Sequence, residues 1–339
     1  MKIVTMYTQR KSEITNEEFA QYDRQIRLWG LDAQKRLRQS KILVAGVGGF
    51  GSEVVKNIVL SGVFSVTLLD ERKVCEEDFC SQLLITTNHV GMNIAEASKV
   101  RTQELNPNVE VYVDTESLDS KTADYFAKFD IVCVTRCTLQ QRLDINNMCR
   151  KKNVKFFSGD VFGFYGYCFL DLGEHEYVEE VTVNKQVAIS VEDGSAEEKT
   201  KSSETVSTFC SYETALKEDW KLRNRRSLRQ SSSVFYILQI LDEFQSRHQR
   251  LPIQNSMDSL TLSLIRKEIL TKAGMKENFV SDDFQDFCCS VLSPVAAVVG
   301  GVMAQEVIKA CSKKNKPHQN FFFFNGLNHT GIVDNICPK

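Results

Sequence analysis

Three glycines between an apolar strand and an apolar helix constrain the fold of this chain more than any other feature. Lys41–Gly46 (KILVAG) predicts a buried strand, and Gly46, Gly48 and Gly51 follow in the spacing G-x-G-x-x-G. The first glycine permits a tight turn, the second lets the backbone approach a phosphate, and the third lets the next helix pack on the strand. Free amides at the start of that helix, predicted over 50–61, offer a site for an anion. The motif therefore predicts a nucleotide-binding β-α unit.

An acidic residue follows at the distance expected for ribose binding. Val66–Asp70 (VTLLD) predicts a second strand, and Asp70 stands at its end, about 20 residues beyond Gly51. We take Gly46, Gly48, Gly51 and Asp70 as the candidate cofactor-binding residues. The motif does not distinguish NAD from ATP, and glycines that only close a β-α turn beside an empty pocket explain it equally well.

Strand and helix patterns alternate after this unit. Further strands are predicted at 109–113, 131–134 and 154–157, separated by helices at 92–105 and 139–151. Such alternation indicates a doubly wound, mostly parallel sheet. The strands lack polar alternation, as expected when helices cover both faces of a sheet. We therefore predict an α/β, Rossmann-like fold.

The rest of the chain predicts a polar insertion, a helical segment and a final strand pair. Residues 191–207 are polar and short of apolar side chains, so we expect this stretch to be mobile. Helical periodicity returns at 233–247 and 258–273, and a long helix follows Pro294. The carboxyl end reads as two strands joined by a Gly/Asn-rich turn.

Composition argues against several classes of function. The formal net charge of −2 gives no general attraction to nucleic acid or to an anionic membrane. No apolar run approaches the roughly 20 residues that span a bilayer, and the first residues lack a secretory signal. The eleven cysteines form no CxxC pair and the five histidines lack metal-ligand spacing. We therefore expect no metal site built by this chain.

Four longer motifs go beyond the glycine turn. YDRQIRLWG at 22–30, the GVGGFG turn, HVGMNIAEA at 89–97 and PVAAVVGGVMAQEVIKA at 294–310 resemble the ubiquitin-like activating enzyme family. The segment 158–180, with the NFFFFNG tail, is similar to the smaller, non-thioester-forming subunits of heterodimeric SUMO-activating enzymes in that family. The resemblance covers almost the whole chain, and it implies a ThiF/MoeB-like adenylation fold.

The resemblance also implies a function for the chain as one half of a heterodimer. An active half binds ATP and magnesium and joins the carboxyl terminus of the modifier to AMP, before a catalytic cysteine takes the acyl group as a thioester. This chain resembles the partner half, which is not expected to be active alone. Its implied partners are the larger catalytic subunit, SUMO and, indirectly, the SUMO-conjugating enzyme. ATP and Mg would be bound mainly by the larger subunit. The resemblance also implies that the protein is located in the nucleus and also in the cytoplasm.

The sequence itself indicates that the nucleotide pocket of this chain is degenerate. An active half carries the pattern D-x-D-x-I-x-x-S-N-L-x-R-Q after its second strand, and this chain reads DERKVCEEDFCSQ over 70–82. Asp70 is retained, but a carboxylate at the position of the family's asparagine would repel a triphosphate. A threonine hydroxyl replaces the magnesium-binding aspartate and is a poor ligand for a hard cation. The departures from the family pattern are Arg72, Asp78, Ser81, Ile94 and Thr138.

Arg24 is the candidate catalytic residue. A helix is predicted from Thr15 to Gly30, with a capping box of Thr15 and Glu18. At about 100° per residue, Arg24 lies opposite an apolar face, which is made by Phe19, Tyr22, Ile26 and Trp29. By resemblance, this arginine crosses the dimer interface towards the γ-phosphate of ATP held by the larger subunit. A solvated surface arginine is the alternative.

Other polar residues receive simpler interpretations. Arg27 is expected to pair with Asp23 one turn away, as a helper or a bystander. Cys210 lies nearest the segment where active relatives insert a cysteine domain, and we interpret it as inert. His175, between two glutamates, is expected at the surface. The basic run Lys221–Arg229 is either a nuclear localisation signal or a solvated surface.

Three parts of the chain follow from these predictions. Residues 1–180 hold the amino-terminal part of the adenylation-type fold, 181–230 the polar insertion, and 231–339 the helical segment and the completion of the fold. The alternatives are an NAD-dependent oxidoreductase, an independent adenylating enzyme for a ubiquitin-like modifier, and a scaffold in which Arg24 contributes only surface charge.

Overall fold

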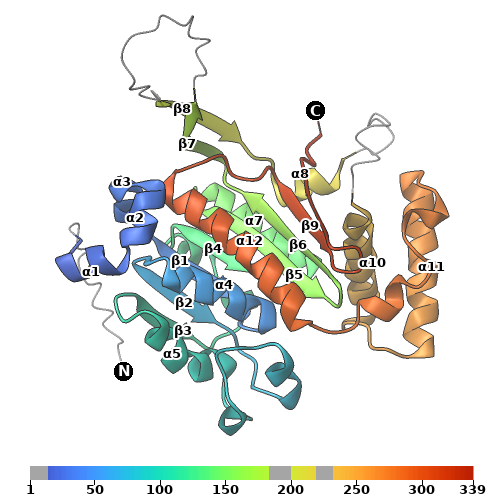
Figure 1. The fold of residues 1–339 in the computed structure, drawn as a ribbon. Coiled ribbons are helices and arrows are strands. Elements are labelled where there is room, and N and C mark those ends of the chain that lie inside the picture. Colours follow the sequence, from blue (N-terminus) through green and yellow to red (C-terminus); the bar gives the residue numbers. More distant parts are fainter. Residues whose placement is uncertain (1–13, 183–199, 219–231, 339) are drawn as a thin grey trace, which may run out of the picture.

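An eight-stranded sheet forms the centre of the chain, with helices on both faces (Figure 1). The computed structural model describes residues 14–182, 200–218 and 232–338. The strand order is β10-β9-β6-β5-β4-β1-β2-β3, in which the five strands β1 to β5 pair in parallel and the other three pair antiparallel. The strands are β1 (Lys41–Ala45), β2 (Ser65–Leu69), β3 (Glu110–Asp114), β4 (Ile131–Val134), β5 (Lys155–Phe162), β6 (Tyr165–Asp171), β9 (Phe321–Asn325) and β10 (Thr330–Asp334). The predicted mostly parallel α/β architecture and the final strand pair are confirmed.

The helices form two apolar clusters, one on each side of the sheet. One cluster joins the strands to α3 (Leu31–Leu37), α4 (Gly49–Leu60), α5 (Ile94–Leu105) and α12 (Ser293–Ser312). The other joins them to α6 (Ala123–Phe126), α7 (Leu139–Lys151), α8 (Tyr212–Leu216), α10 (Ser233–His248) and α11 (Ser256–Ala273). Both faces of the sheet are therefore covered, as the unbroken apolar strands predicted.

Helix α12 packs along α4 on the first face (Figure 1). Within the described ranges it is the one helix long and apolar enough to cross a membrane, and 67% of its most apolar stretch is buried inside the protein. A Cβ on Gly300 would lie 2.8 Å from the Cβ of Glu53 on α4, whereas a Cβ on Gly301 would meet nothing within 4 Å. Gly300 thus allows the two helices to approach closely.

The amino-terminal segment forms two short helices instead of the single helix predicted from Thr15 to Gly30. Helix α1 (Asn16–Gln21) carries the predicted capping box of Thr15 and Glu18, and α2 (Asp23–Trp29) begins after a break at Tyr22. Tyr22 is buried, but Phe19 is 45% exposed, so the predicted single apolar face is wrong at Phe19. The break turns the second helix independently of the first.

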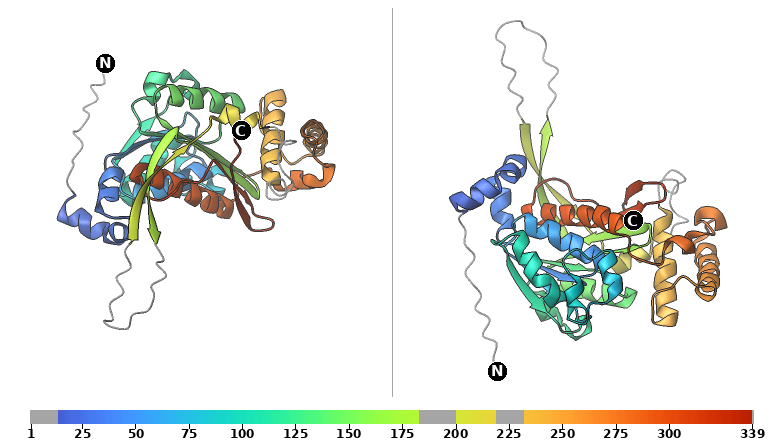
Figure 2. Two further views of the ribbon diagram at one scale, coloured as in Figure 1. Left: turned by 90° about the horizontal axis from the view of Figure 1, so that it is seen from above. Right: turned by 60° about the horizontal axis from the view of Figure 1, so that its bottom comes forward.

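A two-stranded ribbon, β7 (Glu174–Thr182) with β8 (Thr200–Thr208), extends from the body of the molecule (Figure 2). Residues 200–207 were predicted to belong to a mobile polar stretch, and the structure corrects this because they form a regular strand. The segment after it continues into α8, where Tyr212 is fully buried. The basic run 221–229 lies outside the described residues.

Candidate functional site

The glycine turn lies at the carboxyl edge of the sheet, between the ends of β1 and β4. Gly46 has a φ of +91°, and a Cβ there would lie 2.5 Å from the carbonyl oxygen of Thr135. A Cβ on Gly51 would overlap the carbonyl oxygen of Gly46, so the third glycine permits the helix to pack on the strand. Helix α4 begins directly at the turn, and its N-cap is Gly48, which has no side chain to cap the first amides. The backbone of a nucleotide-binding turn is therefore present.

Asp70 is committed to donors within the protein. It lies directly after β2 and is 5% exposed. One carboxylate oxygen accepts the amide of Val47 at 2.8 Å and Nη2 of Arg72 at 3.0 Å, and the other accepts the amide of Arg72 at 3.0 Å. The residue predicted to bind a ribose is thus bound by the chain's own arginine and backbone.

Two guanidinium groups and three carboxylates meet around the turn. Arg72 lies 3.7 Å from Asp78 as well as bonding Asp70, and Arg72 and Arg136 both approach Gly48. The backbone amide of Arg136 donates to Asp160 at 3.1 Å, and burial raises the pKa of Asp160 although Arg136 opposes this. Because acids here outnumber the cations, the surroundings of the turn do not favour a triphosphate.

The other departures from the active pattern have structural roles in this chain. The Thr138 hydroxyl accepts the amide of Gln141 at 3.2 Å and begins α7 through a capping box. Ser81 contacts Gly49 across the turn, at the place where a Cβ would otherwise fit. Ile94 is fully buried at the start of α5. These side chains do not fit a bound Mg·ATP, because each is occupied elsewhere or is apolar.

Arg24 lies on α2, which contacts the end of α4 opposite to the glycine turn. Its side chain is exposed, and across the part of the chain that the structure describes no hydrogen bond or ion pair holds its guanidinium. The neighbouring Arg27 bonds Asp23 at 3.1 Å, which confirms that predicted pair. Leu28, four residues beyond Arg24 and on the same side of the helix, is 75% exposed.

Comparison with known proteins agrees with this geometry. Residues 22–339 match the ThiF family. The chain belongs to the ThiF family. It is 45% identical over 336 residues to SUMO-activating enzyme subunit 1 of Homo sapiens and, equally, of Pongo abelii, covering 96% of this chain and 97% of each relative. The same subunit of Danio rerio is 44% identical over 337 residues, with the same coverage. The resemblance predicted from the motifs is confirmed.

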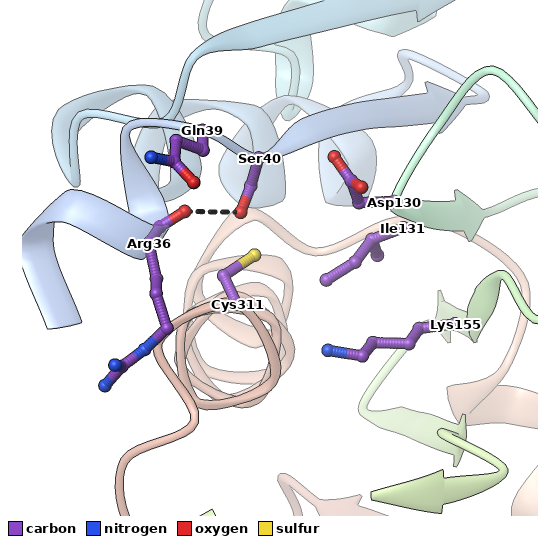
Figure 3. Close-up of a pocket in the computed structure, with 7 residues that line it drawn as sticks. All are labelled: Arg36, Gln39, Ser40, Asp130, Ile131, Lys155 and Cys311. Atoms are coloured by element: carbon purple, nitrogen blue, oxygen red, sulfur yellow. Dashed lines mark hydrogen bonds between the residues drawn. The ribbon is translucent and has the colours of Figure 1, made fainter. Parts of the chain in front are cut away.

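A cavity of about 180 Å³ in this ThiF-family chain lies at the opposite edge of the sheet from the glycine turn (Figure 3). Arg36 donates to the carbonyl oxygen of Ser312 at 2.6 Å and Lys155 donates to that of Ala310, so both cations bond carbonyls at the end of α12. Burial raises the pKa of the Cys311 thiol in the same cavity to about 11. These contacts indicate a structural role. The lining residues are Arg36, Gln39, Ser40, Asp130, Ile131, Lys155 and Cys311.

A larger cavity of about 650 Å³ lies at the carboxyl end of β3, the strand next to β2. Its central ammonium, Lys121, bonds Asp114 and Glu116 at 2.7 Å each, and the Tyr125 hydroxyl bonds Asp114 at 2.7 Å. The carboxylates of this cavity are therefore matched by protein donors, as Asp70 is.

The structure bears on two further predictions, for Cys210 and for His175. Burial raises the pKa of Cys210 to about 12, the opposite of what a thioester nucleophile needs. His175 is 2% exposed on β7, so the expectation of a surface position was wrong. The alternation of Glu174, His175, Glu176 and Tyr177 was the missed signal, because it places every second side chain on the buried face.

Proposed function

We propose that this chain is the smaller, non-thioester subunit of a SUMO-activating enzyme and that it donates Arg24 to the ATP site of the larger subunit. The names of the similar proteins support the first part. A contrast within the chain carries the second part. The guanidinium of Arg72 is bound by acids beside the chain's own turn, whereas that of Arg24 is exposed on α2 and pairs with no residue in the described ranges.

The surroundings of Arg24 support a protein partner. Leu28, Leu31 and Leu60 are 75%, 38% and 44% exposed, and Gln25 donates to the carbonyl oxygen of Leu60 at 3.3 Å, which places the end of α4 beside α2. Large apolar side chains that are exposed on neighbouring elements are typical of an interaction surface. We infer that this corner of the molecule faces the larger subunit.

Arginine suits the proposed chemistry. Its guanidinium is always charged and planar, and it can hold phosphate oxygens through two donors. When the modifier's carboxylate attacks the α-phosphate of ATP, negative charge grows on the departing pyrophosphate, and an arginine at the γ-phosphate stabilises it. ATP and Mg belong mainly to the larger subunit in this proposal, since the residues at this chain's own turn do not fit them. In this proposal SUMO supplies the carboxylate that is adenylated, and the SUMO-conjugating enzyme receives SUMO after the thioester has formed.

A matched pair of arginine variants tests the proposal. In the reconstituted heterodimer, Arg24→Ala should lower ATP–pyrophosphate exchange at limiting ATP by about a hundredfold, the usual cost of removing one group that stabilises transition-state charge. Arg27→Ala, on the same helix and already paired with Asp23, should stay close to wild type. Equal activity of Arg24→Ala and wild type would refute the donated arginine.

The same assay separates the remaining alternatives. Exchange by the isolated chain at the rate of the heterodimer would indicate an independent adenylating enzyme, and saturable NADH fluorescence would indicate an oxidoreductase. We also propose, from the resemblance alone, that the subunit works in the nucleus and also in the cytoplasm. Imaging of a fluorescent fusion with and without the run 221–229 tests that location.

A further inference from the structure

The carboxyl end of α4 is held by side chains from α2, from α3 and from the residue that follows α5. The last carbonyls of a helix lack partners within it, and here three carbonyls at this end accept side-chain amides. Gln25 of α2 donates to Leu60 at 3.3 Å, Gln34 of α3 donates to Ser61 at 3.0 Å, and Asn106 donates to Val59 at 2.9 Å. The helix that carries Arg24 is thus tied to α4 through the residue next to it.

Tyr22 provides a second attachment just before Arg24. Its side chain is 1% exposed, and its hydroxyl accepts Nδ2 of Asn106 at 2.8 Å. The ring lies against Gly62, where a Cβ would stand 2.5 Å from the ring carbon Cζ and 2.7 Å from the hydroxyl oxygen. Gly62 has a φ of +80°, and its missing side chain leaves the space that the ring occupies.

We infer that Tyr22 and Gln25 are positioning residues that fix α2 on the end of α4, so that Arg24 is presented outward in one orientation. This inference rests on the proposed function of Arg24. Tyr22 sits at the break between α1 and α2, where the chain would otherwise pivot, and Gln25 holds the first turn of α2. Neither side chain needs to touch the nucleotide. A shift of about 1 Å at such a position can lower a rate by about a hundredfold.

Gly62→Ala tests the attachment without altering Arg24. The added methyl group overlaps the Tyr22 ring and should displace α2, so hydrogen exchange of residues 23–29 in the reconstituted heterodimer should accelerate. Gly91→Ala is the matched control, because Gly91 has a φ of +83° but a Cβ there would meet nothing within 4 Å. If hydrogen exchange of residues 23–29 is as slow in Gly62→Ala as in wild type, the inference is overturned. Gln25→Ala, at a half-buried position, gives the same test if Gly62→Ala fails to fold.

Activity then shows whether the attachment acts through Arg24. Gly62→Ala should lower ATP–pyrophosphate exchange by about a hundredfold, and it should cause no further loss in an Arg24→Ala background. Tyr22→Phe, which keeps the ring beside Gly62, should stay near wild type, whereas Tyr22→Ala should not. An equal further loss in the Arg24→Ala background would overturn the positioning role. If Arg24→Ala is fully active, the proposed function fails, and hydrogen exchange alone still decides the attachment.

Discussion

Two neighbouring glycines in α12 should respond oppositely to the same substitution. Gly300 faces α4, and a Cβ there would lie 2.8 Å from the Cβ of Glu53 and 3.5 Å from the carbonyl oxygen of Phe50. Gly301 faces away, and a Cβ there would meet nothing within 4 Å. Both residues are inside a 20-residue helix, so the backbone term of each Gly→Ala change is the same.

The magnitudes follow from that geometry. Replacing a helix-interior glycine by alanine stabilises a helix by about 1 kcal/mol. Gly301→Ala should show this gain, because nothing opposes the methyl group. At Gly300 the methyl group would force α12 away from α4, and overpacking of a core costs about 1–3 kcal/mol. Gly300→Ala should therefore lie between neutral and about 2 kcal/mol less stable than wild type.

Urea unfolding of the two variants, followed by circular dichroism, measures the difference. The slope of free energy against urea should be unchanged, so the midpoints can be compared directly. We expect Gly301→Ala to unfold above wild type and Gly300→Ala at or below it. Equal shifts in the same direction for both variants would refute the packing argument.

Two further perturbations test the buried charges. Asp242→Ala leaves the guanidinium of Arg142 buried without its carboxylate, so the free energy of unfolding should fall by about 3–5 kcal/mol in urea, whereas Glu268→Ala, at the exposed partner of Arg247, should leave the midpoint unchanged. Burial, with Lys155 and Lys313 nearby, lowers the pKa of His175 to about 3, below its unfolded value of about 6.5, so the unfolded chain binds the proton first and stability falls as the pH drops below about 6.5. Between neutral pH and about pH 5.5, the free energy of unfolding of wild type should fall by about 1 kcal/mol more than that of His175→Phe. An identical pH dependence of the two proteins in urea unfolding would contradict the assignment.

Local patterns predicted the sheet and the turn because they depend on neighbours in sequence. The apolar strand at 41–45, the glycine spacing after it and the Thr15 capping box each form within a few residues. The long helix after Pro294 was predicted for the same reason, since proline suits the first turn of a helix. Periodicity and capping are therefore sufficient for such elements.

Contacts between distant segments explain the errors. The helix breaks at Tyr22 because its ring enters a space left by Gly62, 40 residues away. Residues 200–208 look polar alone, but they form a strand because β7 supplies its partner. The sequence also did not predict the pairing of Arg72 with Asp70. Comparing motifs shows that a ligand of the nucleotide is lost, but it does not show which contacts the replacing side chain makes.

The length of α4 has a genetic consequence. Its amino end is the glycine turn and its carboxyl end lies beneath α2, so its twelve residues separate the two by about 18 Å. That length exceeds the reach of an arginine side chain, and the proposed function accordingly gives Arg24 a nucleotide held by the partner subunit. In that arrangement a pair of subunits stays complete as long as one of them keeps the pocket and the other keeps the arginine. Complementation between two differently damaged alleles follows from the same separation.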